Sequence, residues 1–514
     1  MRAAGVTLFA LLAVAAVVPA REPTKQELLV AVEKQLRAAN ETAGPAVACV
    51  VVSKSDRYPK PAAAPDAPGK LGGFGSKEFI KADPTPAAAR LAEALDLSDP
   101  KSVPDHGYAC GVVIDPSGLV LTPYHVVEGA TKVFVHLPGR VGSYADIHAA
   151  DARHDLAVLK LIAPPQGLTA IKFADVRADD RNGQRATVFR GKLVVLMANA
   201  YVTGSAPDKP SAALGSVTGF RTPEGTPPMK ERPSDSYYFF GPLLEHDALL
   251  LHDAQLTAGV DGAALLNLDG EFVGLTTSAA AVPGGARGPH YAFPADDNFR
   301  RVVDVLRRGE EVEYGYLGVM DPTGGPNGVR FSSVQAQGPA ARAGLDEHDV
   351  VTQVNGHPTN TYQALLFRVG SALAGERVKL TVRRDGRLRE VEVTLGKLKN
   401  NQAVIASVRP DPVFGLRVDY SSLLAQKTMG DARLLSNGVP PGVCVRDLTA
   451  NAPAAAAFKK LGDDPNRWLI THVNGAAVGT PAEFYKAAKG QPSVKLTVKD
   501  PTELNGRDRE VTLP

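Results

Sequence analysis

A glycine-framed aspartate, Asp261, stands at the centre of the stretch that most constrains how this chain folds. The stretch covers residues 253–274, and its centre reads Gly-Val-Asp-Gly over residues 259–262. An Asn-Leu-Asp-Gly turn follows at 267–270, and an apolar run follows the turn at 272–275. Glycine and asparagine favour tight turns, and short apolar runs between turns favour strands. The pattern therefore predicts strands joined by turns, with Asp261 held in one of the turns.

Two earlier stretches place a histidine and an aspartate beside strands. Strands are expected at 112–114 and 119–121, because the Asp-Pro-Ser-Gly segment between them is a favourable turn. The second strand runs into residues 122–130, Thr-Pro-Tyr-His-Val-Val-Glu-Gly-Ala, which places His125 at a strand end. Asp155 opens the run Asp-Leu-Ala-Val-Leu-Lys, which predicts another strand. A histidine at a strand end is by itself more often structural than catalytic, so the surrounding motifs decide its interpretation.

Together these three stretches resemble the trypsin-like serine proteases of the HtrA/Deg type. In that family the histidine segment reads Thr-Asn-x-His-Val-Val-x-Gly-Ala, and the aspartate segment reads Asp-x-x-x-Asp-Leu-Ala-Val-Leu-Lys. The resemblance places His125 as the general base and Asp155 as the carboxylate that orients it. It also places Asp261 where the family has its nucleophilic serine, in Gly-Asn-Ser-Gly-Gly-Pro-Leu. The order histidine, aspartate, nucleophile is that of the chymotrypsin-like fold.

The aspartate at the serine position changes the chemistry that the resemblance implies. A carboxylate is already deprotonated and is a weak nucleophile, and its charge favours an imidazolium that cannot act as a general base. The family's oxyanion-hole donors correspond to the backbone N–H groups of Gly259 and Asp261, which could turn inward onto the Asp261 carboxylate. Ala263 and Ala264 replace the glycine and proline that follow in the family. Alternatively, residues 259–262 form only a tight turn between strands.

The first twenty residues indicate export. They have a basic start and a short apolar run, and Val18 and Ala20 suit signal-peptidase cleavage after Ala20. A membrane anchor is the alternative, but the run is short for a span of about 20 apolar residues. We therefore expect a secreted or periplasmic protein with no membrane span once the signal is removed. The formal net charge of +2 gives no indication of a nucleic-acid partner or a membrane surface.

The mature chain begins with an N-terminal region at 21–105. A helix is expected from the capping box Thr-Lys-Gln-Glu at 24–27, followed by a buried strand at 47–52. Residues 58–105 are rich in Pro, Ala and Gly and predict a long insertion, which matches the place of a mobile loop in HtrA-type proteases. Three cysteines are too few for a disulfide framework. Cys49 and Cys110 lie in or beside predicted strands, and whether they pair or stay separate buried thiols is left open.

An internal repeat follows the protease-like region at 106–310. The sequence Val-Val-Thr-Gln-Val-Asn-Gly at 350–356 recurs as Leu-Ile-Thr-His-Val-Asn-Gly at 469–475. The region 316–396 resembles a PDZ domain along its whole length, and the region 412–514 resembles one less completely. We therefore expect a mainly β protein, with a chymotrypsin-like double β-barrel followed by two PDZ-like α+β modules.

PDZ domains bind an extended peptide at a sheet edge and hold its C-terminal carboxylate in a nest of backbone N–H groups. In the first module, the resemblance places this nest at Tyr316, Leu317, Gly318 and Val319. In the second module, it places the nest at Phe414, Gly415 and Leu416, although that module is equally well explained as a packing unit without a peptide ligand.

Three functions are compatible with these features. The favoured one is an HtrA-like pseudo-protease that binds unfolded proteins or peptides with free C-termini, as a scaffold or in protein quality control. The alternative is an active HtrA-like serine endopeptidase, for which Ser278 is the only nearby candidate nucleophile, although it lacks a glycine frame. The third is a metal site formed by His125, Asp155 and Asp261, against which trypsin-like geometry argues, because it points Asp155 at the back of the imidazole. We expect no cofactor and no metal, and the resemblance allows a homo-oligomer.

Overall fold

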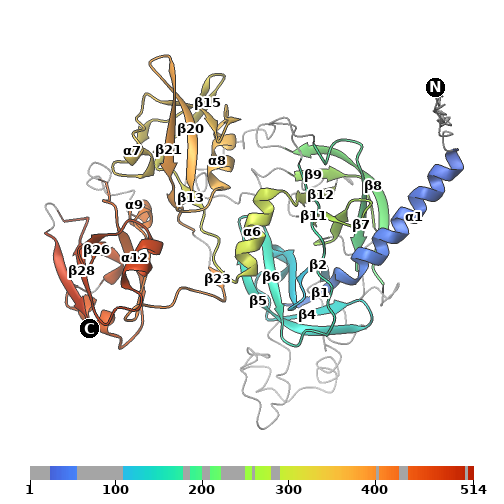
Figure 1. The fold of residues 1–514 in the computed structure, drawn as a ribbon, viewed down its shortest axis with the longest axis horizontal. Coiled ribbons are helices and arrows are strands. Elements are labelled where there is room, and N and C mark those ends of the chain that lie inside the picture. Colours follow the sequence, from blue (N-terminus) through green and yellow to red (C-terminus); the bar gives the residue numbers. More distant parts are fainter. Residues whose placement is uncertain are drawn as a thin grey trace, which may run out of the picture.

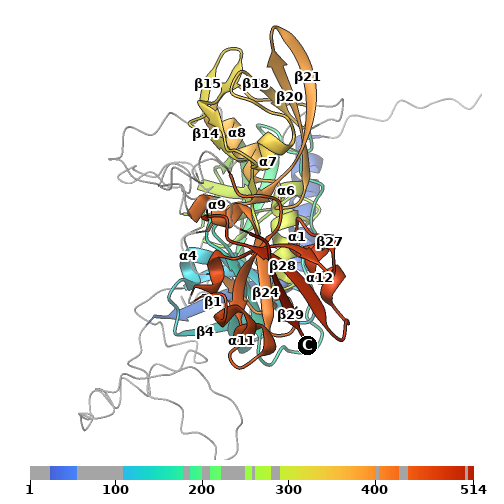
Figure 2. The same cartoon turned by 90° about the vertical axis from the view of Figure 1, so that its left-hand side faces the viewer.

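The computed structural model describes eleven segments of the chain. They are residues 24–54, 108–177, 186–199, 209–221, 249–256, 261–278, 290–400, 404–427, 438–462, 464–503 and 507–514. Two β-barrels form one half of the molecule, and helix α1 (Lys25–Ala43) projects from their outer side (Figure 1). Two smaller modules lie on the opposite side of the barrels, one above the other (Figures 1 and 2). None of the described helices is both long enough and apolar enough to span a bilayer.

Six strands close the first barrel. They run in the order β5-β4-β1-β2-β3-β6, and β6 pairs back with β5. The elements of this region are α1, the 3-10 helix η1 (Gly44–Ala46), β1 (Val47–Ser53), β2 (Tyr108–Asp115), β3 (Leu119–Pro123), α4 (Tyr124–Val127), β4 (Lys132–Leu137), β5 (Val141–Asp151) and β6 (Leu156–Leu161). The predicted capping box is present at the start of α1, where the side chains of Thr24 and Glu27 satisfy each other's backbone N–H groups.

The second barrel is also closed, in the order β10-β11-β12-β9-β8-β7. Its strands are β7 (Leu193–Ala198), β8 (Ser211–Arg221), β9 (Leu249–His252), β10 (Ala264–Leu266), β11 (Phe272–Thr277) and β12 (His290–Pro294), and helix α6 (Asp297–Arg307) follows them. The side chain of Asp296 caps α6 by accepting a hydrogen bond from the backbone N–H of Phe299. The expected double β-barrel is therefore confirmed.

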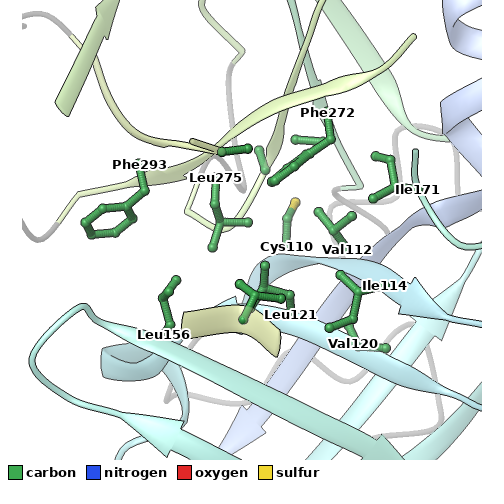
Figure 3. Packing of buried hydrophobic residues seen from close by; sticks show 14 of the residues in the cluster. Cys110, Val112, Ile114, Val120, Leu121, Leu156, Ile171, Phe272, Leu275 and Phe293 are labelled. Carbon is green, nitrogen blue, oxygen red and sulfur yellow. The ribbon is translucent and has the colours of Figure 1, made fainter. Parts of the chain in front are cut away.

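The two barrels share one hydrophobic core. Leu121 and Leu156 of the first barrel face Leu275 and Phe293 of the second (Figure 3). Phe272 is fully buried in the same core. Truncation of such a side chain to alanine typically costs about 3–5 kcal/mol, because a cavity remains where the ring was. A continuous apolar interior thus joins the two barrels.

The two smaller modules repeat one α+β plan. The first contains β13 (Gly315–Tyr316), β14 (Val319–Met320), β15 (Thr323–Gly325), β16 (Gly328–Arg330), β17 (Ser333–Val334), α7 (Pro339–Arg342), β18 (Val350–Val354), β19 (His357–Pro358), α8 (Tyr362–Gly370), β20 (Arg377–Arg384), β21 (Arg387–Thr394) and β22 (Gly396–Lys397). The second contains β24 (Leu416–Tyr420), α9 (Ser422–Lys427), β25 (Val443–Leu448), α11 (Pro453–Lys459), η6 (Pro465–Arg467), β26 (Leu469–Val473), β27 (Ala476–Ala477), α12 (Pro481–Ala488), β28 (Val494–Lys499) and β29 (Arg509–Leu513).

The repeated Val-Asn-Gly sequence forms the same hairpin turn in both modules. Asn355 and Gly356 both have positive φ, at 50° and 79°, and Asn474 and Gly475 have φ values of 51° and 81°. Two successive positive φ values are what a two-residue hairpin turn requires, and Asn-Gly meets that requirement at little strain. The sequence repeat is therefore a structural repeat, and the two PDZ-like modules are confirmed.

The segment between the two modules returns to the first barrel. Strand β23 (Ile405–Ala406) adds to the outer edge of β5, with Ile405 opposite Ala150. The next residue, Ser407, donates its backbone N–H to the carbonyl of His148. The connection between the modules is thus fixed to the barrel by strand pairing.

Candidate catalytic centre and peptide-binding nests

His125 is positioned by the single turn of helix α4 that follows β3. Its backbone N–H donates to Oδ1 of Asp155 at 2.7 Å, and its Nδ1 lies 2.7 Å from Oδ2 of the same carboxylate. Thr277, at the end of β11, donates its hydroxyl to Oδ2 of Asp155 at 3.2 Å. Asp155 is buried, so these three contacts replace the water that its carboxylate loses. One barrel supplies the histidine and the aspartate, and the other supplies a supporting hydroxyl.

Asp261 lies on the opposite edge of the same imidazole. Its Oδ2 is 3.6 Å from Nε2 of His125. The carboxylate also accepts two hydrogen bonds from Ser278, one from the backbone N–H at 2.5 Å and one from the hydroxyl at 2.7 Å. The structure therefore brings His125, Asp155 and Asp261 together where the barrels meet, as the motif order predicts.

The turn around Asp261 is held by strand β2. The backbone N–H of Cys110 donates to the carbonyl of Asp261 at 2.7 Å. Gly262 has φ of +70°, and a Cβ at this position would lie 2.1 Å from the carbonyl oxygen of Cys110. Only glycine fits both the conformation and the space. The turn that holds Asp261 thus requires a glycine at position 262.

The two carboxylates hold His125 in its protonated form. Burial alone would lower the pKa of His125, but the hydrogen bonds and negative charges of Asp155 and Asp261 outweigh it and raise the pKa to about 10. Burial would raise the pKa of Asp261, but its contacts with His125 and Ser278 lower it below the ordinary value. The raised pKa of His125 and the lowered pKa of Asp261 both favour an imidazolium between two carboxylates.

The geometry also bears on the other sequence-based candidates. Asp155 faces Nδ1 and Asp261 faces Nε2, so one metal ion could not bind both carboxylates together with the ring. Within the described segments, no group of three or more His, Cys, Asp or Glu side chains is arranged to hold a metal ion. Ser278 donates to Asp261, and in the described residues it makes no hydrogen bond to His125. Gly259, predicted at the oxyanion-hole position, lies outside the described residues.

Sequence reasoning missed the supporting roles of Thr277, Ser278 and Cys110. Thr277 ends strand β11 and Ser278 follows it directly, whereas Cys110 precedes Asp261 by more than a hundred residues. Their positions beside the site depend on strand pairing between distant segments. The one available signal was that Ser278 lies directly beyond the second strand after the glycine-framed turn.

The two predicted nests have matching backbone geometry. In the first module the carbonyls of Leu317 and Gly318 accept from the N–H groups of Ala340 and Gln335, both at 2.9 Å. In the second, the carbonyl of Phe414 accepts from Ala454 at 3.1 Å, and that of Gly415 accepts from Thr449 at 2.7 Å. The glycines have φ of +81° and +83°. Residues 317–319 and 414–416 therefore occupy equivalent positions.

The two nests differ in which of their backbone N–H groups already donate a hydrogen bond within the protein. In the first module, Gly318 and Met320 direct their carbonyls toward the segment of β17. Strand alternation therefore turns the N–H of Val319 to the other edge of β14, which pairs with no strand among the described residues. In the second, the equivalent N–H of Leu416 donates to the carbonyl of Val413 at 2.9 Å. The N–H of Val418, two residues on, lies 3.4 Å from the hydroxyl of Tyr485.

A cavity of about 500 Å³ adjoins the second nest. It lies between residues 410–414 and the C-terminal end of α12, and Val413, Phe414, Tyr485 and Lys489 are among its lining residues. The cavity is open to solvent at one end of the edge strand β24, but the contacts of Leu416 and Val418 occupy the edge itself.

Comparison with known proteins agrees with this architecture. Residues 109–275 match the family model of the trypsin-like peptidase domain, and residues 305–395 match that of the PDZ domain. Fold and site together thus define a trypsin-like peptidase domain joined to PDZ modules. Within that class, the chain is similar to the HtrA/Deg-type proteases.

The relatives of known sequence cover about three quarters of the chain. One is the periplasmic serine endoprotease DegP of Escherichia coli strain K12, with 28% identity over 396 residues that span 75% of this chain and 72% of that protein. Another is a probable DegP-like periplasmic serine endoprotease of Brucella suis biovar 1, with 29% identity over 417 residues that span 79% of this chain and 72% of that protein. A solved HtrA-type protease, AlgW with a decapeptide, is 20% identical, covers 73% of this chain and 99% of its own, and superimposes with a TM-score of 0.45.

Proposed function

We propose that this protein is a periplasmic HtrA-type pseudo-protease that binds exposed or C-terminal peptide segments of other proteins. One observation carries the proposal. The carboxylate of Asp261 lies 3.6 Å from Nε2 of His125, where a serine protease of this family needs a neutral hydroxyl. An oxyanion intermediate would develop its charge beside this carboxylate, so the electrostatic stabilisation that normally lowers the barrier is opposed.

A second candidate function, active endoproteolysis, is favoured by the comparisons. The relatives named above are described as serine endoproteases, and they cover most of this chain. The chemistry at residue 261 favours the first candidate instead, because a different nucleophile would have to reach the substrate carbonyl. Ser278 donates its hydroxyl to Asp261, so its proton is directed at a carboxylate and not at the imidazole.

A protease assay separates the two candidates. The natural chain, Asp261→Ser and Asp261→Asn are incubated with an unfolded protein substrate at neutral pH. The pseudo-protease proposal expects no cleavage by the natural chain or by Asp261→Asn, which removes the charge without supplying a hydroxyl. Cleavage by the natural chain that is abolished by His125→Ala would refute the proposal and support active endoproteolysis.

Peptide binding is proposed for the first PDZ-like module in particular. The N–H of Val319 lies on the edge of β14 that pairs with no strand in the described part of the chain, which supports its availability to a peptide carboxylate or backbone. In the second module, the corresponding N–H of Leu416 is used within the chain, and Tyr485 covers that of Val418. We therefore assign the second module a packing role.

Export to the periplasm is part of the same proposal. It is supported by the basic and apolar start of the chain, with cleavage after Ala20, and by the periplasmic location stated for the relatives. N-terminal sequencing of the protein exported from its host tests this part, and an N-terminus at Met1 would contradict it.

A further inference from the structure

We propose that Cys49 and Cys110 form an intramolecular disulfide when the protein is oxidised, which creates a redox-modification site at the base of the Asp261 turn. The two residues are direct partners on neighbouring strands, β1 and β2. The structure holds both as thiols, and both side chains are fully buried. This inference goes beyond peptide binding and does not depend on it.

The backbone hydrogen bonds of Cys110 show whether Cys49 and Cys110 form a hydrogen-bonded or a non-hydrogen-bonded pair in the antiparallel ladder. Its N–H donates to the carbonyl of Asp261, and its carbonyl accepts from the hydroxyl of Thr122 at 2.9 Å. Both backbone groups therefore point away from β1, so Cys49 and Cys110 form a non-hydrogen-bonded pair. In such pairs the Cα atoms are about 4.5 Å apart and the side chains are closest. This spacing lies within the range of about 4.4–6.8 Å that disulfides span, so little backbone movement is needed. Disulfide formation would replace the contacts that Sγ of Cys110 makes with the backbone N–H and carbonyl of Asn199.

The third cysteine provides an internal contrast. Cys444 lies on β25 of the second module and packs in a separate cluster with Leu424 and Leu469. Its Sγ donates to the carbonyl of Tyr420. The fold therefore brings two of the three cysteines together and leaves the third in another module, which makes the predicted pairing specific.

The reaction is a thiol–disulfide exchange with a disulfide oxidant, either a small molecule or a protein. A new Sγ–Sγ bond joins Cys49 to Cys110, and the oxidant leaves as two thiols that carry the two electrons and two protons. The thiolate is the attacking species, and burial, together with the nearby Cys49 and Asp261, raises the pKa of Cys110. Exchange should therefore be slow in the closed barrel and faster while the barrel is still forming. An oxidising compartment would favour the product.

The location gives the bond a structural consequence. The disulfide would link β1 to β2, the strands that flank the predicted insertion. Cys110 also donates its backbone N–H to the carbonyl of Asp261, so the disulfide would lie next to the Asp261 turn. Closing the loop between the two cysteines restricts the unfolded chain, so the oxidised protein should unfold at a higher temperature than the reduced one.

Thiol counting tests the proposal on the natural full-length chain. The protein is refolded with oxidised glutathione, denatured, alkylated and weighed by mass spectrometry. We expect one alkylated or glutathione-blocked cysteine without prior reduction, three alkylated cysteines after reduction, and a peptide map that links Cys49 to Cys110. Cys444→Ser should give none without reduction, and Cys49→Ser should give two alkylated or glutathione-blocked cysteines and no link between residues 49 and 110. Three alkylated cysteines in the natural protein after oxidant treatment, or a linkage to Cys444, would overturn the proposal.

Discussion

Asp261 and His125 form an ion pair, with Oδ2 of the carboxylate 3.6 Å from Nε2 of the imidazole. Asp155 on the other edge of the ring and Ser278 on the far side of Asp261 complete a chain of four polar side chains. Each member has a partner, so the arrangement resembles a structural network more than a site prepared to transfer a proton.

This pair predicts that His125 stays protonated at neutral pH. The pKa of His125 is raised to about 10 because two carboxylates outweigh the effect of burial. Asp261→Asn removes one of these charges, so the midpoint should fall by about 1–3 pH units. NMR titration of the His125 ring resonances measures both values. A natural chain in which His125 titrates near 6.5 would contradict the ion-pair description.

The same shift predicts how stability depends on pH. The folded-state pKa of His125 lies above its ordinary value of 6.5, so its stabilising contribution is complete below pH 6.5. It is lost as pH rises from 6.5 through about 10. Thermal melts over this range should show a decline in Tm that is smaller in Asp261→Asn. An equal decline in the two proteins would show that the pair contributes nothing to folding.

A separate prediction concerns the buried lysine that joins the modules. Lys397 Nζ lies 2.9 Å from Glu311, 2.8 Å from Glu313 and 2.9 Å from Asp419 of the second module. Lys397→Met removes the cation that the three carboxylates share and leaves Glu311 and Asp419 paired only with Arg446. Breaking a buried pair costs about 3–5 kcal/mol, so we expect a loss of stability up to that size. Trp468 is the only tryptophan and lies buried in the second module, so its fluorescence in urea reports the loss.

The matched control is Lys379→Met. Lys379 pairs with Glu390 at 2.7 Å on an exposed surface, and such pairs contribute about 0–1 kcal/mol. Its unfolding midpoint should stay near that of the natural chain. If both lysine variants shift the midpoint equally, the buried cluster does not couple the modules as we describe.

Peptide binding should take place in the first module with one peptide per chain. A peptide with a free, apolar C-terminus should bind, and its amidated form should not, because the nest is built for a carboxylate. Gly318→Ala forces a side chain into φ of +81°, with its Cβ 3.2 Å from Pro339, so affinity should fall. A penalty of about 1–2 kcal/mol corresponds to roughly a tenfold loss.

Gly415→Ala is the corresponding change in the second module. Its added Cβ would lie 2.1 Å from the Cβ of Ala452, so the local strain is at least as large. Binding measured by titration calorimetry should nevertheless stay unchanged, because the Leu416 N–H is already used by Val413. Two peptides per chain, or a loss of affinity in Gly415→Ala alone, would reverse the assignment of the modules.

The sequence predicted those parts of the molecule that local motifs encode. The order of the segments around His125, Asp155 and Asp261 anticipated the double barrel, and the Asn-Gly repeat anticipated the paired modules. The hydrogen bonds of Ser278 to Asp261 were not predicted, because they depend on how β11 pairs within the closed barrel.

Other features depend on contacts between distant segments and have no periodic signal. Strand β23 pairs with β5 across more than 250 residues, through only two register positions. In the sequence, Tyr485 has no feature that distinguishes it from other helix residues. Its contact with the N–H of Val418 depends on the packing of α12 beside β24. Short pairings and single side-chain contacts of this kind follow from tertiary packing, which local patterns do not specify.

Cleavage of an unfolded protein by the natural chain tests the central claim most directly. The assay follows substrate fragments at neutral pH, with the natural chain and His125→Ala at equal concentrations. Because Asp261 offers no hydroxyl and keeps His125 protonated, we predict that both proteins leave the substrate intact to the same extent. Fragments produced by the natural chain and absent with His125→Ala would contradict the pseudo-protease account and require a nucleophile other than residue 261.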